Sequence, residues 1–233
     1  MVADALGLPR VEVQWNPCYR IIPSRFPPIH LFERVADPGD LDAVFAVESL
    51  TNARLRDEVG ELSLVPPHER VTGPGASWIM APFTHVSSPG GRFSTPYFGA
   101  YYAARDIVTA IAETVYHRQR FLAATREAPT EVDMRVLQAQ LRSDLHDLRG
   151  QRETRRDLYD PGDYGASQRF ATGLRGQGSH GVVYDSVRHA EGQCAAIYTP
   201  RALSKCRQGA HLTYVWDGAR ITSGYEKSGL RQL

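Results

Sequence analysis

The amino-acid sequence predicts an α+β fold: a single domain in which short strands form a split or twisted sheet with flanking helices. Three segments predict strands because apolar and polar residues alternate along them, namely 132–136, 181–187 and 211–222. Few segments repeat apolar residues at helical spacing, and 106–117 is the clearest of them. Many short strands interrupted by a few helices are typical of the α+β class.

Length and composition are those of an ordinary soluble globular protein. The chain has 233 residues, of which 42% are hydrophobic and 23% charged, enough for one large domain with a substantial core. We expect a loose lead-in over residues 1–10 and one domain over residues 11–233. The formal net charge of +1 argues against binding to nucleic acid by phosphate neutralisation, so no direct nucleic-acid partner is expected.

The cysteines and histidines predict neither a disulfide framework nor a metal site. Cys18, Cys194 and Cys206 are odd in number and form no CxxC pair, which favours a reducing compartment. The eight histidines form no HExxH motif and no cluster with cysteine. The first residues lack a signal-peptide pattern, and no apolar run is long enough to span a bilayer. We therefore expect a cytoplasmic protein with no metal and no membrane partner.

The first third of the chain mixes short elements with proline-rich connections. The alternation over 11–15 predicts a short strand, and the four prolines within 16–28 predict a shaped loop. A helix is expected over 40–52, with Asp40 as its cap. The apolar run 76–83 is consistent with a core strand or a short helix.

The second half begins with a strand and then becomes strongly charged. After the strand around 132–136, the segment 144–159 is dense in charge and is expected to form a solvated helix or loop. Asp163 is a good cap for a helix over 164–174, which the glycines at 176 and 178 would end.

Two strands and a β-hairpin are expected toward the C-terminus. In 181–187, alternation places Val182, Tyr184 and Ser186 on one face of the strand. A short apolar strand follows at 194–198. The segment 211–222 predicts a β-hairpin, with Asp217–Gly218 as a type I′ turn.

The stretch from Gly90 to His117 organises the rest of the chain. The glycine pair 90–91 lets the backbone approach a neighbour closely just before Arg92. An aromatic strand is expected over 98–103, and a helix capped by Asp106 follows it.

One carboxylate stands out on that helix. The spacing predicts a buried stripe made of Ile107, Ile111 and Val115. Ala110, Glu113 and His117 fall on another stripe, about opposite, so Glu113 faces either solvent or a cleft. Taken singly, Arg92 and Glu113 are read more readily as surface charges, and the spacing alone names no reaction.

Four motifs together resemble the RES domain family, whose name refers to an arginine, a glutamate and a serine. They are GGRFS at 90–94, YYAA at 101–104, AIAETVYH at 110–117 and VVYDSVR at 182–188. The resemblance extends from Tyr19–Arg20 to YVWDG at 214–218. It implies an ADP-ribosyltransferase-like fold, with NAD as a substrate. It also implies a bacterial toxin that a cognate helix-turn-helix (Xre-like) antitoxin neutralises, while homodimerisation stays open.

The resemblance also implies roles for three arginines in binding NAD. Arg92 would bind the pyrophosphate of NAD, because a guanidinium pairs with phosphate oxygens in a bidentate manner. Arg20, in the early Tyr-Arg pair, would line the same pocket or be a plain surface arginine beside a strand. Arg188 would add a further cation on the substrate side.

The remaining motif residues would act at the reacting bond. Tyr102 would stack on the nicotinamide ring. Glu113 would hold a ribose hydroxyl and stabilise the positive, oxocarbenium-like transition state. Ser186 would donate a hydrogen bond to the ribose or nicotinamide side.

The acceptor of the ADP-ribosyl group stays open at the level of sequence. Water would make the protein a glycohydrolase, inorganic phosphate a phosphorylase, and a protein side chain an ADP-ribosyltransferase. His117 either helps to place the acceptor or is a helix-surface histidine with no role. Two other classes are less favoured: a non-catalytic binding module of the same fold, because the Arg, Tyr, Glu and Ser are all present, and a nuclease toxin, because the net charge is near zero.

Overall fold

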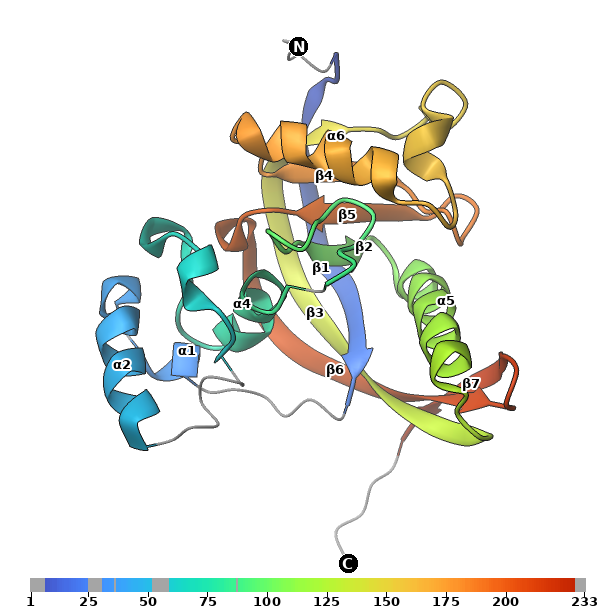
Figure 1. The fold of residues 1–233 in the computed structure, drawn as a ribbon, viewed down its shortest axis with the longest axis horizontal. Coiled ribbons are helices and arrows are strands. Elements are labelled where there is room, and N and C mark those ends of the chain that lie inside the picture. The colour runs from blue at the N-terminus through green and yellow to red at the C-terminus, as the bar shows by residue number, and fades with distance from the viewer. Residues whose placement is uncertain (1–6, 25–30, 36, 52–58, 87, 229–233) are drawn as a thin grey trace, which may run out of the picture.

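The computed structural model describes residues 7–24, 31–35, 37–51, 59–86 and 88–228, and the fold is α+β around one seven-stranded sheet (Figure 1). The strands are β1 (Arg10–Pro23), β2 (Tyr101–Ala104), β3 (Thr130–Asp147), β4 (Gly181–Asp185), β5 (Gln193–Ile197), β6 (Leu203–Trp216) and β7 (Ile221–Lys227). The α-helices are α1 (Leu31–Arg34), α2 (Leu41–Thr51), α4 (Ala76–Thr84), α5 (Ile107–Thr125) and α6 (Gly165–Gly176). Short 3₁₀ turns occupy Pro38–Asp40, Leu62–Leu64, Pro67–Glu69, Arg156–Tyr159 and Pro200–Ala202.

The sheet closes on itself through its longest strand. The strand order is β1-β2-β5-β4-β3-β6-β7, and β1 also pairs with β3, so five strands form a ring of pairings. All pairings are antiparallel except β3 with β4. β3 has 18 residues and pairs with three other strands, β1, β4 and β6, so it is the central strand of the sheet. The sequence predicted short strands throughout, and this is wrong for β1, β3 and β6, which have 14, 18 and 14 residues.

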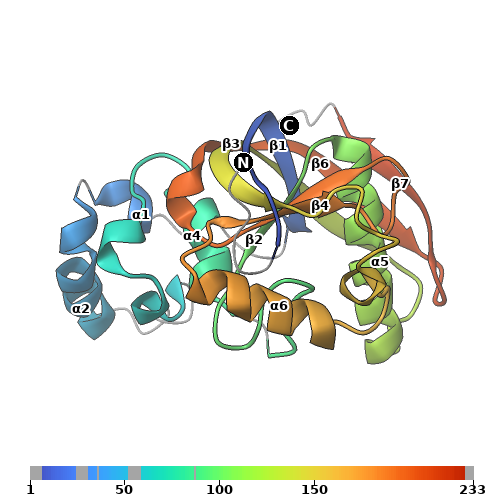
Figure 2. The ribbon, with the colours of Figure 1, turned by 90° about the horizontal axis from the view of Figure 1, so that it is seen from above.

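Two apolar clusters fill the two sides of the sheet. One packs β-strand residues such as Val183 and Leu141 against α4, and the other packs Val182 and Tyr184 beneath α5 and α6. The predicted alternation in β4 is confirmed by this division. Figure 2 shows α1, α2 and α4 gathered at one end of the molecule and α5 at the other. No helix of the described residues combines the length and apolar character that crossing a bilayer requires.

The predicted loop at 16–28 is wrong over its first half, because β1 continues through the prolines to Pro23. The pairing with β3 shifts register between Trp15 and Cys18, and this irregularity accommodates Pro17, which has no N–H to donate. Residues 25–28 lie outside the described part of the chain. The apolar run 76–83 forms a helix, α4, and not a strand.

Other boundaries shift for similar reasons. The aromatic strand predicted at 98–103 is β2, which begins only at Tyr101. Of the charged segment 144–159, residues 144–147 belong to β3, and a 3₁₀ turn ends the segment. The helix at 40–52 begins at Leu41, after a 3₁₀ turn that Asp37 caps, and Asn52 lies outside the described residues.

The hairpin at the C-terminal end is confirmed, but its turn type is wrong. Trp216 pairs with Ile221, which leaves a loop of residues 217–220. A type I′ turn at 217–218 needs positive φ at both positions, and only Gly218 has it. Asp217 instead accepts hydrogen bonds from the backbone N–H groups of Ala219 and Arg220, both at 2.8 Å.

Candidate functional site

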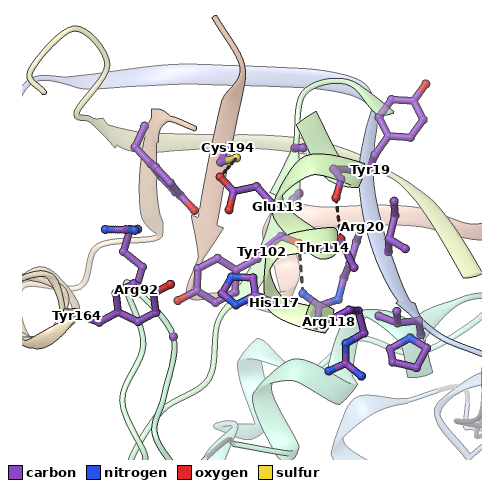
Figure 3. A pocket seen from close by; sticks show the side chains of 18 residues that line it. Tyr19, Arg20, Arg92, Tyr102, Glu113, Thr114, His117, Arg118, Tyr164 and Cys194 are labelled. Atoms are coloured by element: carbon purple, nitrogen blue, oxygen red, sulfur yellow. Dashed lines mark hydrogen bonds between the residues drawn. The ribbon is translucent and has the colours of Figure 1, made fainter. Parts of the chain in front are cut away.

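A cavity of about 310 Å³ lies where α5 crosses β1, β2 and β5 (Figure 3). Residues from elements far apart in the chain line it, among them Arg20, Arg92, Tyr102, Glu113, His117 and Arg118. This volume is at the lower end of the range for small-ligand pockets. The cavity thus brings together Arg20, Arg92, Tyr102 and Glu113 of the predicted site residues.

Arg92 is held in the cavity wall by neutral acceptors. Its side chain is 7% exposed, and Nη1 donates to the carbonyl oxygens of Leu158 at 3.0 Å and Asp160 at 2.7 Å. The guanidinium carbon lies 4.7 Å from the ring centroid of Tyr164, a cation–π contact. Arg92 forms no ion pair with any residue that the structure describes. Its position is therefore fixed without neutralising its charge.

The glycine pair before Arg92 is required by close contacts, as predicted. Gly90 has φ +69°, and a Cβ there would lie 2.4 Å from the carbonyl oxygen of Ser94. A Cβ on Gly91 would lie 2.5 Å from the hydroxyl of Tyr102. From α6, the Nε2 of Gln168 donates to the carbonyl oxygen of Gly91 at 3.0 Å. The loop that carries Arg92 is thus pinned from both sides.

Tyr102 joins the Arg92 loop to the cavity. Its hydroxyl accepts from the backbone N–H of Phe93 at 2.9 Å and lies 3.1 Å from Ser94 Oγ. Burial raises the pKa of Tyr102 to about 12, although the hydrogen bonds from Ser94 and Phe93 oppose the shift. The phenol is therefore neutral at physiological pH, with its hydroxyl held by the loop and its side chain lining the cavity.

Glu113 enters the cavity from α5, whose N-terminus is capped as predicted. The Asp106 side chain accepts the backbone N–H of Thr109 at 2.8 Å. Of the two alternatives for Glu113, solvent or a cleft, the structure has the cleft. Its Oε1 accepts from Ser186 Oγ at 2.6 Å and lies 3.9 Å from Cys194 Sγ. Like Arg92, Glu113 forms no ion pair within the described residues.

The apolar stripe of α5 is less buried than the sequence predicted. Ile107, Ile111 and Val115 pack against the core cluster but keep part of their surface exposed. On the other stripe, Ala110 is 4% exposed, because the cavity wall covers it.

Ser186 lies behind Glu113 and is not among the residues that line the cavity. Its side chain is 1% exposed, and its Oγ accepts from the backbone N–H groups of Arg188 at 3.1 Å and His189 at 3.0 Å. Its one hydroxyl proton goes to Glu113. The serine is thus placed to orient the carboxylate.

Of the two other arginines predicted for the site, Arg20 lies in the cavity and Arg188 does not. Arg20 lines the cavity, with Nη1 donating to the carbonyl oxygen of Tyr102 at 3.2 Å and the guanidinium 4.9 Å from the Tyr101 ring centroid. Arg188 does not line it. Its guanidinium stacks on Tyr116, 3.3 Å from the ring centroid, and donates to the carbonyl oxygen of Pro161.

His117 lies exposed at the edge of the cavity. On its cavity side the ring is desolvated, which lowers the pKa of His117; Glu113 opposes this shift, and the surrounding arginines, Arg188 first, reinforce it. It is therefore mainly neutral at pH 7 and adds no fixed charge to the site.

Sequence reasoning missed several lining residues. They are Tyr164, Arg118, Cys194 and Tyr184. Tyr164 is itself the N-cap of α6 and makes no side-chain capping hydrogen bond, so the cap predicted at Asp163 is wrong. Tyr184 belongs to the motif at 182–188, whereas Arg118 and Cys194 carry no signal in the sequence. Among the described residues, no group of three His, Cys, Asp or Glu side chains could hold a metal ion.

Comparisons with known proteins agree with the motifs. The RES domain model matches residues 67–217. The uncharacterized protein y4oC of Sinorhizobium fredii (strain NBRC 101917 / NGR234) is 33% identical over 209 residues, which cover 89% of this chain and 86% of that protein. A chain in the crystal structure of the M. tuberculosis MbcT–MbcA toxin–antitoxin complex is 14% identical, with a TM-score of 0.46, covering 90% of this chain and 88% of that chain. Since the family model spans more than half of the sequence, the chain belongs to the RES domain family.

Proposed function

We propose that this RES protein consumes NAD by cleaving its nicotinamide–ribose bond. One observation carries the proposal: a buried arginine and a carboxylate line the same cavity, and neither forms an ion pair with a described residue. Such a site suits a ligand that is anionic at one end and becomes cationic at the other during reaction. NAD has this character, with a pyrophosphate and a ribose that passes through an oxocarbenium-like state.

Arg92 is suited to the pyrophosphate end. Within the described part of the chain, Arg92 donates hydrogen bonds through Nη1 alone, to the carbonyl oxygens of Leu158 and Asp160, which leaves the N–H groups of Nε and Nη2 for phosphate oxygens. Arg20 lines the same cavity and adds a second cation. The binding energy gained at this end would hold the reacting bond in place.

Glu113 is suited to the reacting end. As the bond between ribose C1′ and the nicotinamide nitrogen breaks, its electron pair leaves with neutral nicotinamide, and C1′ gains positive charge. A preorganised carboxylate lowers the barrier to that charge. Tyr102 lines the same cavity and offers an aromatic surface for the nicotinamide. Ser186 acts through Glu113 rather than on the ligand.

A small acceptor suits this cavity best. Attack of water or inorganic phosphate on C1′ forms a new C–O bond and releases one proton, giving ADP-ribose or its phosphate ester. We favour these over a protein side chain because Glu113 is partly buried within the cavity. Transfer to a protein target stays the alternative, and a non-catalytic module of the same fold is the outcome if no NAD is consumed.

We further propose that the protein is a cytoplasmic toxin restrained by a helix-turn-helix antitoxin. The cavity presents Arg20, Arg92 and Arg118, so an inhibitory segment with a carboxylate or chain terminus would imitate the pyrophosphate. Expression of the chain alone should stop growth and lower cellular NAD, and co-expression of the antitoxin should reverse both. Normal growth and NAD with folded protein present would favour the non-catalytic module.

The central test is the substitution Glu113→Gln. It keeps the size of the side chain but removes the charge that stabilises the oxocarbenium ion, so NAD turnover should fall by about a hundredfold or more. Purified protein is incubated with NAD, with and without phosphate, and nicotinamide and the ADP-ribosyl products are followed by chromatography.

The matched control is Glu127→Gln, at the end of the turn after α5, where the side chain is exposed and far from the cavity lining. It should leave turnover unchanged. Full turnover by folded Glu113→Gln would remove the glutamate from the mechanism.

A further inference from the structure

We propose that Thr109 and His189 are positioning residues for Glu113. Together they fasten the β4–β5 loop to the first turn of α5, so that the carboxylate and its hydrogen-bond donor move as one unit. This inference rests on the proposed function, because it concerns the residue assigned to the reacting bond.

The hydroxyl of Ser186 has one proton to donate and two sites that can accept hydrogen bonds. Both acceptor sites are used by backbone N–H groups, of Arg188 at 3.1 Å and His189 at 3.0 Å. The proton is therefore left for Glu113 Oε1 at 2.6 Å. This oxygen acts as the acceptor, so the loop backbone fixes the direction of the Ser186 hydroxyl and thereby the position of the carboxylate.

The β4–β5 loop is held to α5 by a contact between His189 and Thr109. His189 Nδ1 lies 2.9 Å from the hydroxyl of Thr109, which is fully buried. The Thr109 hydroxyl also lies 2.7 Å from Asp106 Oδ2. Desolvation would raise the pKa of Asp106, but the hydrogen bonds from Thr109 outweigh it and lower that pKa. Because the ionised Asp106 can only accept, Thr109 donates to it, and His189 Nδ1 must carry a proton and donate to Thr109.

The β4–β5 loop packs closely against α5 at Gly192. A Cβ on Gly192 would lie 2.5 Å from Thr109 Oγ1 and 2.8 Å from His189 Nδ1, so the loop backbone packs directly on this contact. The loop is closed by the backbone N–H of Ser186, which donates to the carbonyl oxygen of Gly192 at 2.7 Å. The loop can therefore shift only if the contact between His189 and Thr109 breaks.

Helical spacing places Thr109 on the same side of α5 as Glu113, because the two residues are four residues apart. The helix thus contacts the loop twice, through Thr109 to His189 and through Glu113 to Ser186. If the contact between Thr109 and His189 is lost, the hydrogen bond between Ser186 and Glu113 should become less well ordered, although no residue that touches the ligand has been changed.

Two matched pairs of variants test the inference. Thr109→Val removes the hydroxyl at constant shape, whereas Thr109→Ser keeps it. His189→Gln loses the donor at the Nδ1 position, whereas His189→Asn places an amide N–H there. Thr125→Val serves as the control, since it removes a hydroxyl that bonds only to Phe121 and Leu122 carbonyl oxygens at the far end of the same helix.

We expect Thr109→Val and His189→Gln to lower kcat for NAD by about tenfold with KM changed less than about twofold. Thr109→Ser, His189→Asn and Thr125→Val should stay near wild type. A purely structural role predicts instead a loss of melting temperature with kcat per folded molecule unchanged, and that result would overturn the inference. If Thr109→Val does not fold, the His189 pair decides alone.

A second readout does not depend on NAD turnover. Nitrogen NMR of the wild type should show His189 protonated at Nδ1, and hydrogen exchange should show protected amides at Arg188 and His189. Both amides should exchange faster in Thr109→Val but not in Thr109→Ser. Unprotected amides, or an unprotonated Nδ1, in the wild type would refute the inference. Protected amides in a protein that leaves NAD intact would refute the proposed function and leave the loop contact standing.

Discussion

Two buried arginines in this molecule are held in different ways. Arg70, 4% exposed, donates from Nε to the carbonyl oxygen of Val65 at 2.9 Å and from Nη2 to that of Leu62 at 3.3 Å, and pairs with Asp42 at 2.9 Å. Its hydrogen-bond partners lie within eight residues of it in the chain. Arg92, 7% exposed, is held by two carbonyl oxygens 66 and 68 residues away and forms no ion pair with a carboxylate of the described residues.

We interpret this difference as that between a structural cation and the cation that we propose for ligand binding. Burying a charge is costly unless a partner compensates it, so a structural arginine is surrounded by acceptors and a counter-ion, as Arg70 is. Arg92 is fixed in place but keeps its charge for the cavity. Glu113 mirrors it, because its donors, Ser186 and Cys194, are neutral.

The largest effect on folding should come from Arg70→Met. The change leaves the carbonyl oxygens of Val65 and Leu62 without their donor, so the free energy of unfolding should fall by about 2–3 kcal/mol. Urea denaturation measures this loss. The affinity for NAD should stay within about twofold of wild type, and a large loss of affinity in folded protein would break the comparison.

Arg92→Lys should have the opposite signature. Lysine keeps the charge but loses the planar fork, so the Kd for NAD should rise by about tenfold or more, as calorimetry would show. The free energy of unfolding should change little, because the lysine ammonium can still donate to the carbonyl oxygens of Leu158 and Asp160. Unchanged affinity together with a marked loss of stability would place Arg92 in the same structural class as Arg70.

The smallest effect should be the pH dependence contributed by His117. Its folded-state pKa lies below the ordinary value of 6.5, so as pH falls through 6.5 the unfolded chain takes up a proton more readily than the folded one. Wild type should therefore lose slightly more melting temperature than His117→Gln between about pH 7.5 and about pH 5.5. A relative gain in wild type would reverse the sign we assign.

The sequence alone determined features that depend on neighbours in the chain. Three features follow from local geometry: the cap of α5 by Asp106, the alternation that puts Val183 on the opposite face from Val182 and Tyr184, and the need for glycine at position 90. The family motif also pointed to Arg92, Tyr102 and Glu113, which the fold brings to one cavity. Periodicity and turn chemistry act over a few residues, so a single sequence reveals them.

Tertiary structure decided what depends on distant partners. Pairing with β3 extends β1 through prolines that locally favour a loop, because ladder hydrogen bonds along a long neighbour outweigh one missing donor. The same closure places Ser186 behind Glu113 and turns Arg188 onto Tyr116, away from the cavity. Where a side chain points after a strand ends depends on sheet register and on which helix packs above it. Only the folded chain fixes these two quantities.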